Sequence, residues 1–231
     1  MTAALVPRPS SRIPLTTVVT LVPVAAALNI VGGSINTGLG LPTFLDTIGT
    51  AVAAIVLGPW WGALVGIFGN VAGAFISGPV GIPFALVNMA SALVWGYGVR
   101  SLGMGASVPR FFLLNIIVAI VTSAIAAPIV VFVFGGATGH PSDTLTAAFA
   151  TAGNDLLAAT FASSILVSLA DKIISGFVAL SIIAALPVAL TLGVRLPEAP
   201  GQRRLALSIA GVVVGAAFIL VYVLITPTAQ P

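Results

Sequence analysis

The sequence contains no cysteine, which excludes a disulfide framework, a cysteine-ligated metal site and a thiol nucleophile. Charge is scarce as well, since only 6% of the 231 residues are Asp, Glu, Lys or Arg, against about 25% in soluble domains. Eight basic and five acidic side chains are too few to solvate a 23.1 kDa globule. With 59% hydrophobic residues and a mean hydropathy of +1.22, the composition predicts an all-α integral membrane protein with the lipid bilayer as its main solvent.

Motifs of the common enzyme classes are also missing. The sequence has no phosphate-binding GxxxxGK[ST] loop, no HExxH and no GxSxG. We therefore expect no enzyme activity, no catalytic residue, no cofactor and no metal site. The formal net charge of +3 does not predict a nucleic-acid partner, because the basic residues stand singly between apolar runs instead of forming a stripe.

Apolar runs separated by Pro and Gly predict the membrane spans, since a helix needs roughly 20 apolar residues to cross a bilayer core. Six runs make up a membrane domain over residues 14–192, and the seventh is an extra C-terminal span. The first run could instead be a cleaved signal peptide, but it is longer than the usual signal core of about 7–15 residues, which favours an uncleaved helix. The runs are 14–33, 43–58, 60–77, 83–99, 109–134, 172–192 and 204–226.

The arginines predict the orientation. With a cytoplasmic N-terminal tail at 1–13 and a cytoplasmic linker at 193–203, seven spans place every arginine inside, as the positive-inside rule expects. The chain is then a multi-pass protein of the cytoplasmic membrane. Residues 143–170 are apolar enough to resemble another span, but counting them would move Arg195 outside. We therefore expect short outer-face helices, interfacial or re-entrant, at 143–170.

Polar side chains within the spans mark candidate binding residues, because burying them in a membrane is unfavourable. Phe84, Asn88, Ser91 and Trp95 share one helical face, which suits a flat, hydrogen-bonding ligand. The alternative is hydrogen bonding between helices, with Trp95 as packing. Asn70 lies in the outer half of the third span. It stands beside a row of glycines that predicts close helix packing, namely Gly62, Gly66, Gly69 and Gly73.

Three charged residues complete the candidate site. Asp46 opens the second span, either as a helix N-terminal acid or as a ligand or pairing contact. Asp171 and Lys172 are expected at the outer start of the sixth span. Adjacent helical residues point about 100° apart, so we expect no pair between them. Lys172 would then pair with Asp46 or Asp155, or contact the ligand.

These groups gather toward the outer end of the predicted bundle, whereas the cytoplasmic half is plainer. The pattern indicates a dead-end pocket open to the outside, because a channel would show polar residues along its whole length. The candidate substrate-binding residues are Asp46, Asn70, Phe84, Asn88, Trp95, Asp171 and Lys172.

Several short segments follow one another in a consistent order between about 35 and 190. They are 41–51 (LPTFLDTIGTA), 57–66 (LGPWWGALVG), 83–88 (PFALVN) and 171–175 (DKIIS), which leads to Leu186-Pro187. In this order they resemble the substrate-binding S components of energy-coupling factor (ECF) transporters. The resemblance implies a six-helix protein that captures a vitamin or similar micronutrient from outside. In that family the S component docks on a transmembrane coupling subunit driven by two cytoplasmic ATPase subunits.

Two features depart from the family pattern. The first helix of the family often carries an Ala-x-x-x-Ala docking pattern, whereas residues 24–29 (VAAALN) place Asn29 four positions after Ala25. The run at 204–226 follows the family's sixth helix as an addition. Two other classes remain open: a self-sufficient secondary carrier, although no internal repeat is visible, and a membrane sensory or scaffold module.

Overall fold

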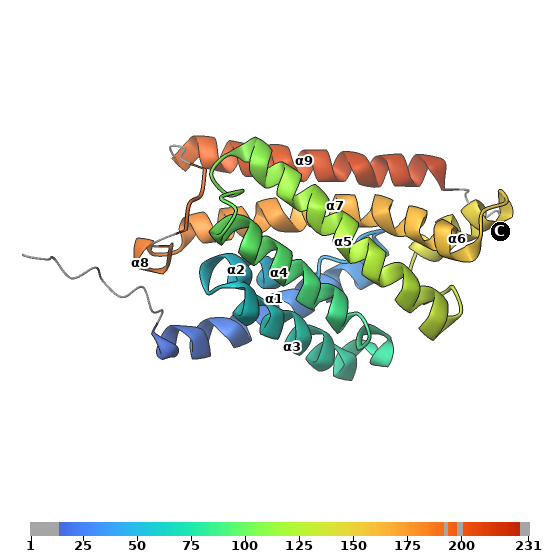
Figure 1. Ribbon diagram of the computed structural model, residues 1–231, viewed down its shortest axis with the longest axis horizontal. Helices are drawn as coiled ribbons and strands as arrows, with labels where there is room; N and C mark the ends of the chain where they lie inside the picture. Colours follow the sequence, from blue (N-terminus) through green and yellow to red (C-terminus); the bar gives the residue numbers. More distant parts are fainter. Residues whose placement is uncertain (1–13, 192–193, 198–200, 227–231) are drawn as a thin grey trace, which may run out of the picture.

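The computed structural model describes residues 14–191, 194–197 and 201–226, and within them the chain is helical without any strand (Figure 1). The elements are α1 (Leu15–Leu39), α2 (Ile48–Val56), α3 (Pro59–Ser77), the 3₁₀ turn η1 (Pro79–Gly81), α4 (Ala85–Arg100), α5 (Val108–Phe134), α6 (Ser142–Thr151), α7 (Leu156–Ala185), α8 (Val188–Thr191) and α9 (Gly201–Ile225).

Four helices, α1, α3, α5 and α7, are long and apolar enough to cross a membrane. The prediction of an all-helical chain suited to a membrane is therefore confirmed. The number of crossings, six or seven, stays a prediction. The span expected at 43–58 is wrong as a full-length helix, because α2 has only 9 residues. At 1.5 Å per residue such a helix reaches roughly 14 Å, less than half of a bilayer core.

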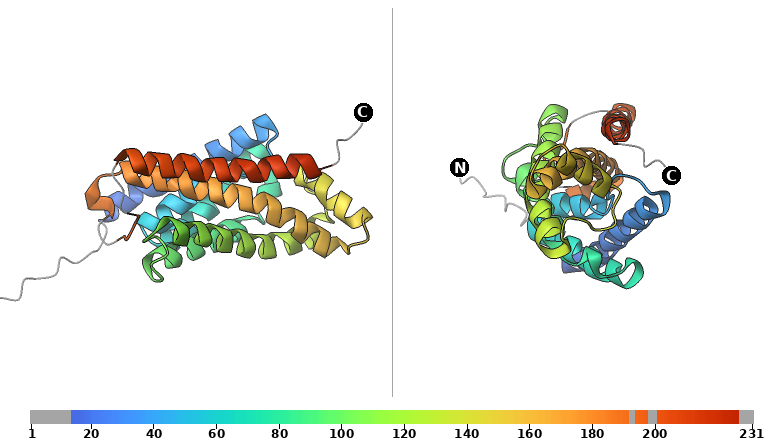
Figure 2. Two further views of the ribbon diagram at one scale, coloured as in Figure 1. Left: turned by 90° about the horizontal axis from the view of Figure 1, so that it is seen from above. Right: turned by 90° about the vertical axis from the view of Figure 1, so that its right-hand side faces the viewer.

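The helices run along the long axis of the molecule, and the chain changes direction at its two ends (Figures 1 and 2). One end holds α8, the end of α4 and the start of α5, and we call it the arginine end for Arg100, Arg110 and Arg195. The opposite end, which holds α6, is the α6 end. α7 is the central helix and packs against α2, α5, α6 and α9.

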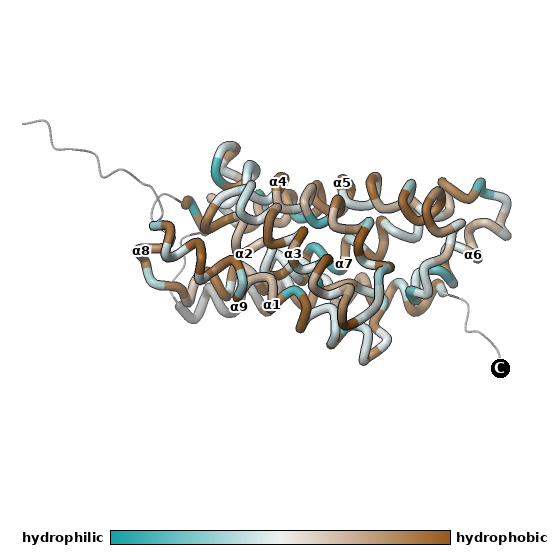
Figure 3. Tube along the Cα trace, turned by 90° about the horizontal axis from the view of Figure 1, so that it is seen from below, coloured by the Kyte–Doolittle hydropathy of each residue, from teal (hydrophilic) through white to brown (hydrophobic). Residues whose placement is uncertain are grey.

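The outside of the bundle is apolar. In the most hydrophobic windows of α1, α3 and α5 only 28%, 28% and 33% of the residues are buried, against 61% in α7. Large side chains such as Phe75 and Phe132 are 90% and 77% exposed. Hydrophobic colour accordingly extends along the long helices in Figure 3. Lipid contact explains this distribution, since water would disfavour so large an exposed apolar surface.

The segment 143–170 differs from the expectation of separate outer-face helices. α6 is a short helix of 10 residues. Residues 156–170, however, form the first half of α7, which has 30 residues in all. Asp155 caps its N-terminus, where its Oδ1 accepts from the Ala158 N–H at 3.0 Å. The predicted start of the sixth span near Lys172 is therefore wrong. One long helix counts as a single crossing. The positive-inside placement of the arginines therefore does not require a helix break near Lys172.

The glycines of α3 pack closely, as predicted. A Cβ atom added at Gly62 would lie 2.5 Å from the Cβ of Ala54 on α2. One added at Gly66 would lie 3.0 Å from the Cβ of Asn88 on α4. Gly73 differs, because nothing lies within 4 Å of its added Cβ. The glycine row of α3 thus lies against α2 and α4, and at Gly73 it borders a cavity.

Candidate functional site

A cavity of about 420 Å³ occupies the half of the bundle nearest the α6 end. Its walls come from the C-terminal halves of α1, α3 and α5, from the N-terminal parts of α4 and α7, and from the loops after α1, α3 and α5. Because these helices alternate in direction, the parts named all lie at the same end. The intramembrane polar groups therefore gather at one end, as the sequence predicts. We call this space the polar cavity.

The floor of the polar cavity is closed by an apolar core toward the arginine end. Trp95 and Phe111 are 0% exposed and Phe177 is 2% exposed within one continuous cluster. Phe111 and Phe177 meet edge to face, with ring centroids 5.6 Å apart. These aromatic side chains fill the described bundle below the cavity.

One wall is built by a loop that folds back into the bundle. After α1 the chain re-enters, so that α2 begins inside the molecule at Ile48. Asn36 holds this loop, because its Nδ2 donates to the carbonyl oxygens of Leu41 (3.3 Å) and Thr43 (2.6 Å). Non-helical backbone at this depth is tolerated because it is hydrogen-bonded and lines a cavity. The loop at 40–47 thus folds into the bundle and forms a wall of the cavity.

The same loop is tied to the middle of α7 through Asp171. The Oδ1 of Asp171 accepts from the N–H groups of Phe44 (3.2 Å) and Leu45 (2.7 Å). These two contacts join residues more than 120 positions apart in sequence. Asp171 is 0% exposed and does not line the polar cavity. Its carboxylate therefore positions the loop behind the cavity wall.

Asp171 also forms a buried ion pair with its neighbour. Lys172 Nζ lies 2.6 Å from Asp171 Oδ2 and donates to Thr47 Oγ1 at 3.1 Å. The expectation that these adjacent residues do not pair is wrong. Their Cβ atoms diverge on the helix, but the long lysine side chain bends back to the carboxylate held by the loop. Lys172 also lines the polar cavity.

Neither partner predicted for Lys172 forms a salt bridge with it among the described residues. Asp155 serves as the cap of α7. Asp46 lines the polar cavity, and its Oδ2 accepts from Asn88 Nδ2 at 2.9 Å. Asp46 precedes Thr47, the N-cap of α2, and the first turn of α2 contains no acidic residue.

Three other predicted residues also line the polar cavity. Asn70 donates its Nδ2 to Gly66 O on its own helix at 3.0 Å. Phe84 stacks on Phe134 with ring centroids 5.8 Å apart. Asn88 lines the cavity from α4, and its side-chain amide donates to Asp46. The structure thus brings Asp46, Asn70, Phe84, Asn88 and Lys172 together.

Trp95, like Asp171, is a predicted residue that does not line the polar cavity. It is fully buried in the core, where its Nε1 donates to Asn115 Oδ1 on α5 at 2.8 Å. The residues that share this face of α4 therefore lie at different depths in the bundle. Phe84 and Asn88 line the cavity, whereas Trp95 takes the alternative role of packing with an interhelical hydrogen bond.

The sequence reasoning missed polar residues on α1 and α7. Asn29, Gly33 and Asn36 line the cavity from one face of α1 at i, i+4 and i+7. Ser168 and Ser164 line it from α7, about one and two turns before Lys172 respectively. Both sets of residues recur at helical spacing. This spacing is visible in the sequence once α1 and α7 are taken at their full lengths. The expected run at 14–33 ended too early, and the expected break before Lys172 interrupted the second set.

A cover over the polar cavity is formed by the loop between α5 and α6. His140 stacks on Phe44 with ring centroids 4.6 Å apart, and its Nε2 lies 2.9 Å from Thr43 O. Its Nδ1 accepts from the Ser142 N–H at 3.2 Å, so the ring is neutral with the proton on Nε2. Burial lowers the pKa of His140, although the hydrogen bond to Thr43 opposes this shift.

Hydrogen bonds of two further residues, Asp143 and Tyr222, hold the cover in place. Asp143 Oδ2 accepts from the N–H groups of Thr138 (2.8 Å) and Gly139 (2.7 Å). On α9, the Tyr222 hydroxyl donates to Pro141 O at 2.6 Å. The C-terminal helix therefore reaches the loop that closes the cavity.

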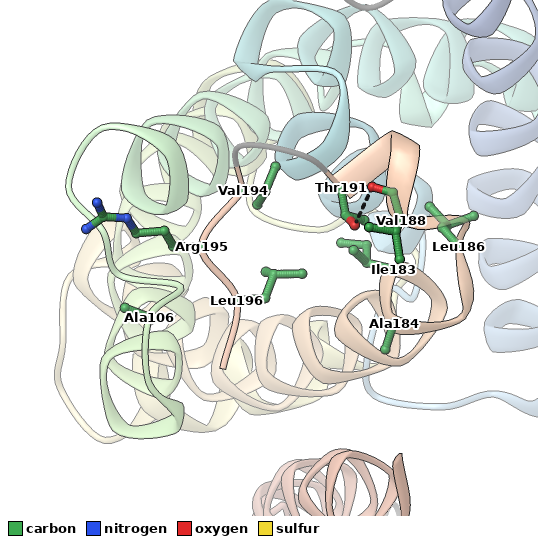
Figure 4. Close-up of a pocket in the computed structure, with 9 residues that line it drawn as sticks. All are labelled: Ala106, Ile183, Ala184, Leu186, Val188, Thr191, Val194, Arg195 and Leu196. Atoms are coloured by element: carbon green, nitrogen blue, oxygen red, sulfur yellow. Dashed lines mark hydrogen bonds between the residues drawn. The ribbon is translucent and has the colours of Figure 1, made fainter. Parts of the chain in front are cut away.

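A second hollow, of about 620 Å³, lies at the arginine end beside α8 (Figure 4). Its lining is mainly aliphatic, with Thr191 and Arg195 as the side chains that carry hydrogen-bonding groups. Thr191 donates its hydroxyl to Val188 O at 3.2 Å, and the Arg195 side chain extends away from the other lining residues. Apart from these two side chains, the polar surface of the hollow comes from the backbone of its described lining residues. The polar cavity is therefore the better candidate site.

Comparisons of this chain with protein-family models, with curated proteins and with solved structures find no match. Among the described residues, no group of three or more His, Asp or Glu side chains is arranged to hold a metal ion. The function of the polar cavity is therefore inferred from its own geometry and chemistry.

Proposed function

We propose that this chain is the substrate-binding S component of an ECF-type transporter and captures a vitamin or similar micronutrient. The observation that carries the proposal is a polar cavity at one end of an apolar helical bundle, closed beneath by packed core. A volume of about 420 Å³ falls within the range of small-molecule sites, about 300–1,000 Å³. The ordered sequence segments that resemble S components supply the family.

The orientation belongs to the proposal. The arginine end faces the cytoplasm by the positive-inside rule, so the polar cavity opens to the outside. The proposal assigns ATP hydrolysis to two cytoplasmic ATPase subunits and energy coupling to a transmembrane partner. The described chain supplies binding, orientation of the ligand and exclusion of water.

The lining is suited to this role. Asn70 and Asn88 offer amides from two different helices, and Phe44 and Phe84 offer aromatic rings in the same cavity. Pockets for small organic ligands are mostly apolar, with a few placed polar groups that fix the orientation of the ligand. The cover that carries His140 lies where a ligand would enter.

The experiment that tests the function is mass spectrometry of small molecules released from the full chain, purified in mild detergent after growth in rich medium. We expect one micronutrient at close to one molecule per chain. A coupling subunit and two ATPases should co-purify from native membranes. Release of no small molecule, or uptake by this chain alone that ionophores abolish, would overturn the proposal. The second of these results would support a secondary carrier.

A further inference from the structure

Among the described residues around the polar cavity, one carboxyl group that lines it, that of Asp46, stands outside the ion pair found there. Asp171 and Lys172 neutralise each other at 2.6 Å, and the two backbone N–H groups of the loop complete the hydrogen bonds of Asp171. The ammonium group of Lys172 donates to Asp171 and Thr47. The charges of this pair thus compensate each other without a ligand.

Asp46 is the acidic residue that lines the polar cavity itself. Its described side-chain partner is the neutral amide of Asn88, and the ion pairs of the described chain include none to Asp46. His140 in the cover is neutral, as its hydrogen bonds indicate. The carboxyl group of Asp46 thus faces the cavity without a described cation as its partner.

The helix dipole of α2 does not replace such a partner. A helix N-terminus carries about half a positive charge. Asp46 stands one residue before the N-cap of α2, so the dipole stabilises its carboxylate only in part. A charge within a membrane bundle needs an opposite charge nearby, and the open space beside Asp46 is the cavity.

The aromatic lining adds a second requirement. Phe44 and Phe84 both line the polar cavity, and Phe44 stacks on His140 in the cover. Aromatic faces attract cations as well as flat rings. A ligand that satisfies both features is flat and positively charged.

We propose that the polar cavity binds a small planar cation, with its positive charge against the carboxylate of Asp46 and its ring against Phe44 and Phe84. This assignment rests on the proposed function and names the class of its substrate. Anionic micronutrients are disfavoured, because the cation available in the cavity, Lys172, is already paired with Asp171.

The test compares three pyridine probes of similar shape and different charge: 1-methylnicotinamide (cation), nicotinamide (neutral) and nicotinate (anion). Binding to the purified full chain is followed by thermal unfolding. We expect the cation to bind about tenfold more tightly than the neutral probe, and the anion to bind most weakly. In Asp46→Asn this preference should fall to about twofold or less.

Two variants serve as controls. Asp155→Asn removes an equal charge at the cap of α7, away from the cavity, and should keep the full cation preference. Asp46→Glu retains the charge and should keep the preference even where Asp46→Asn fails to fold. Equal binding of the anion, or an unchanged cation preference in a folded Asp46→Asn protein, would overturn the inference.

The failures of the two proposals are distinguishable. A neutral or anionic micronutrient released from the protein would overturn the cation class and leave the S-component function standing. A cation preference that depends on Asp46, without any coupling subunit or ATPase in the native complex, would support the inference and overturn the transporter function. No binding of any probe together with no released ligand would overturn both.

Discussion

At the scale of single residues, the Asp171–Lys172 pair links the cavity to the fold. Both side chains are buried, at 0% and 2% exposed, and one of them holds the loop that forms a cavity wall. Removing one partner of a buried pair leaves an uncompensated charge, whereas removing both leaves none. The pair therefore has a structural role that can be separated from ligand contact.

We expect Lys172→Met to lower the free energy of unfolding by about 3–5 kcal/mol, because Asp171 would remain buried without its cation. The double variant Asp171→Asn/Lys172→Met should lose less, since it leaves no buried charge. Denaturant unfolding in detergent measures both. Unchanged stability in Lys172→Met together with lost ligand binding would show that the lysine is a ligand contact.

The His140 cover predicts a dependence on pH. Burial lowers the pKa of His140, so the folded cover favours the neutral ring. Its contribution to stability is present above the unfolded pKa, about 6.5, and is lost as the pH falls through the lower, folded pKa. Protonation would place a second N–H against the Ser142 N–H, which now donates to Nδ1.

We therefore expect amide exchange in the cover, at residues 138–142, to accelerate below neutral pH relative to the core of α7. Hydrogen–deuterium exchange across a pH series, corrected for intrinsic rates, measures this change. In His140→Gln the additional acceleration should disappear. A wild-type cover whose protection is independent of pH would contradict the role of the histidine.

At the scale of helices, α3 shows how one row of glycines serves two purposes. Gly62 and Gly66 allow α2 and α4 to approach, while Gly73 faces open space and lines the polar cavity. Gly69 lies in contact with Asn29 of α1, where the added Cβ would be 3.2 Å from the Asn29 Cβ. A single spacing rule thus predicts the packing face, but not which end of it borders the cavity.

Gly62→Ala should destabilise the protein by about 1–3 kcal/mol, because the added methyl would overpack against Ala54 of a fully buried helix. Gly73→Ala is the matched control on the same helix and should leave the unfolding midpoint nearly unchanged. Thermal unfolding in detergent compares the two. Equal effects of both substitutions would show that close packing does not explain the row.

α9 packs closely against α7, the central helix, at two of its glycines. An added Cβ at Gly211 would clash with the ring of Phe177, and one at Gly215 would clash with the side chain of Ile174. Figure 2 shows α9 running beside α7 over most of its length. The C-terminal helix is thus packed onto the bundle and contacts the cover through Tyr222.

At the scale of the whole molecule, the two ends differ in chemistry. Described arginines lie at one end, and the polar cavity with His140 and Asp143 lies at the other. Arg100 donates its Nη1 to the carbonyl oxygens of Ile55 and Val56 at 3.1 Å, so it also satisfies the end of α2. The asymmetry provides the orientation that the transport proposal needs.

The natural absence of cysteine makes this orientation directly testable. We expect Thr151→Cys, exposed on α6, to react with a membrane-impermeant maleimide in intact cells. Ser101→Cys, exposed at the arginine end, should react only after the membrane is permeabilised. Labelling in the reverse pattern would invert the topology and place the cavity on the cytoplasmic side.

Composition and periodicity determined the class of this protein. Scarce charge and long apolar runs require lipid contact, and the helix bounds of α3, α4 and α5 lie within two residues of the predicted runs. Such features are local, because each residue in a span meets the same solvent whatever its distant neighbours are. The gathering of polar side chains at one end was also predictable from their depth along each span.

Only the tertiary structure decided how the site is built. The loop at 40–47 folds inward because Asp171, more than 120 residues away, accepts its N–H groups, and no local spacing encodes that contact. The same contact draws Asp171 and Lys172 into one pair and leaves Asp46 facing the cavity. Trp95 and Asn88 share a helical face, yet depth in the bundle makes one a core residue and the other a cavity residue. Long-range packing determines depth, and depth determines which polar groups remain free for a ligand.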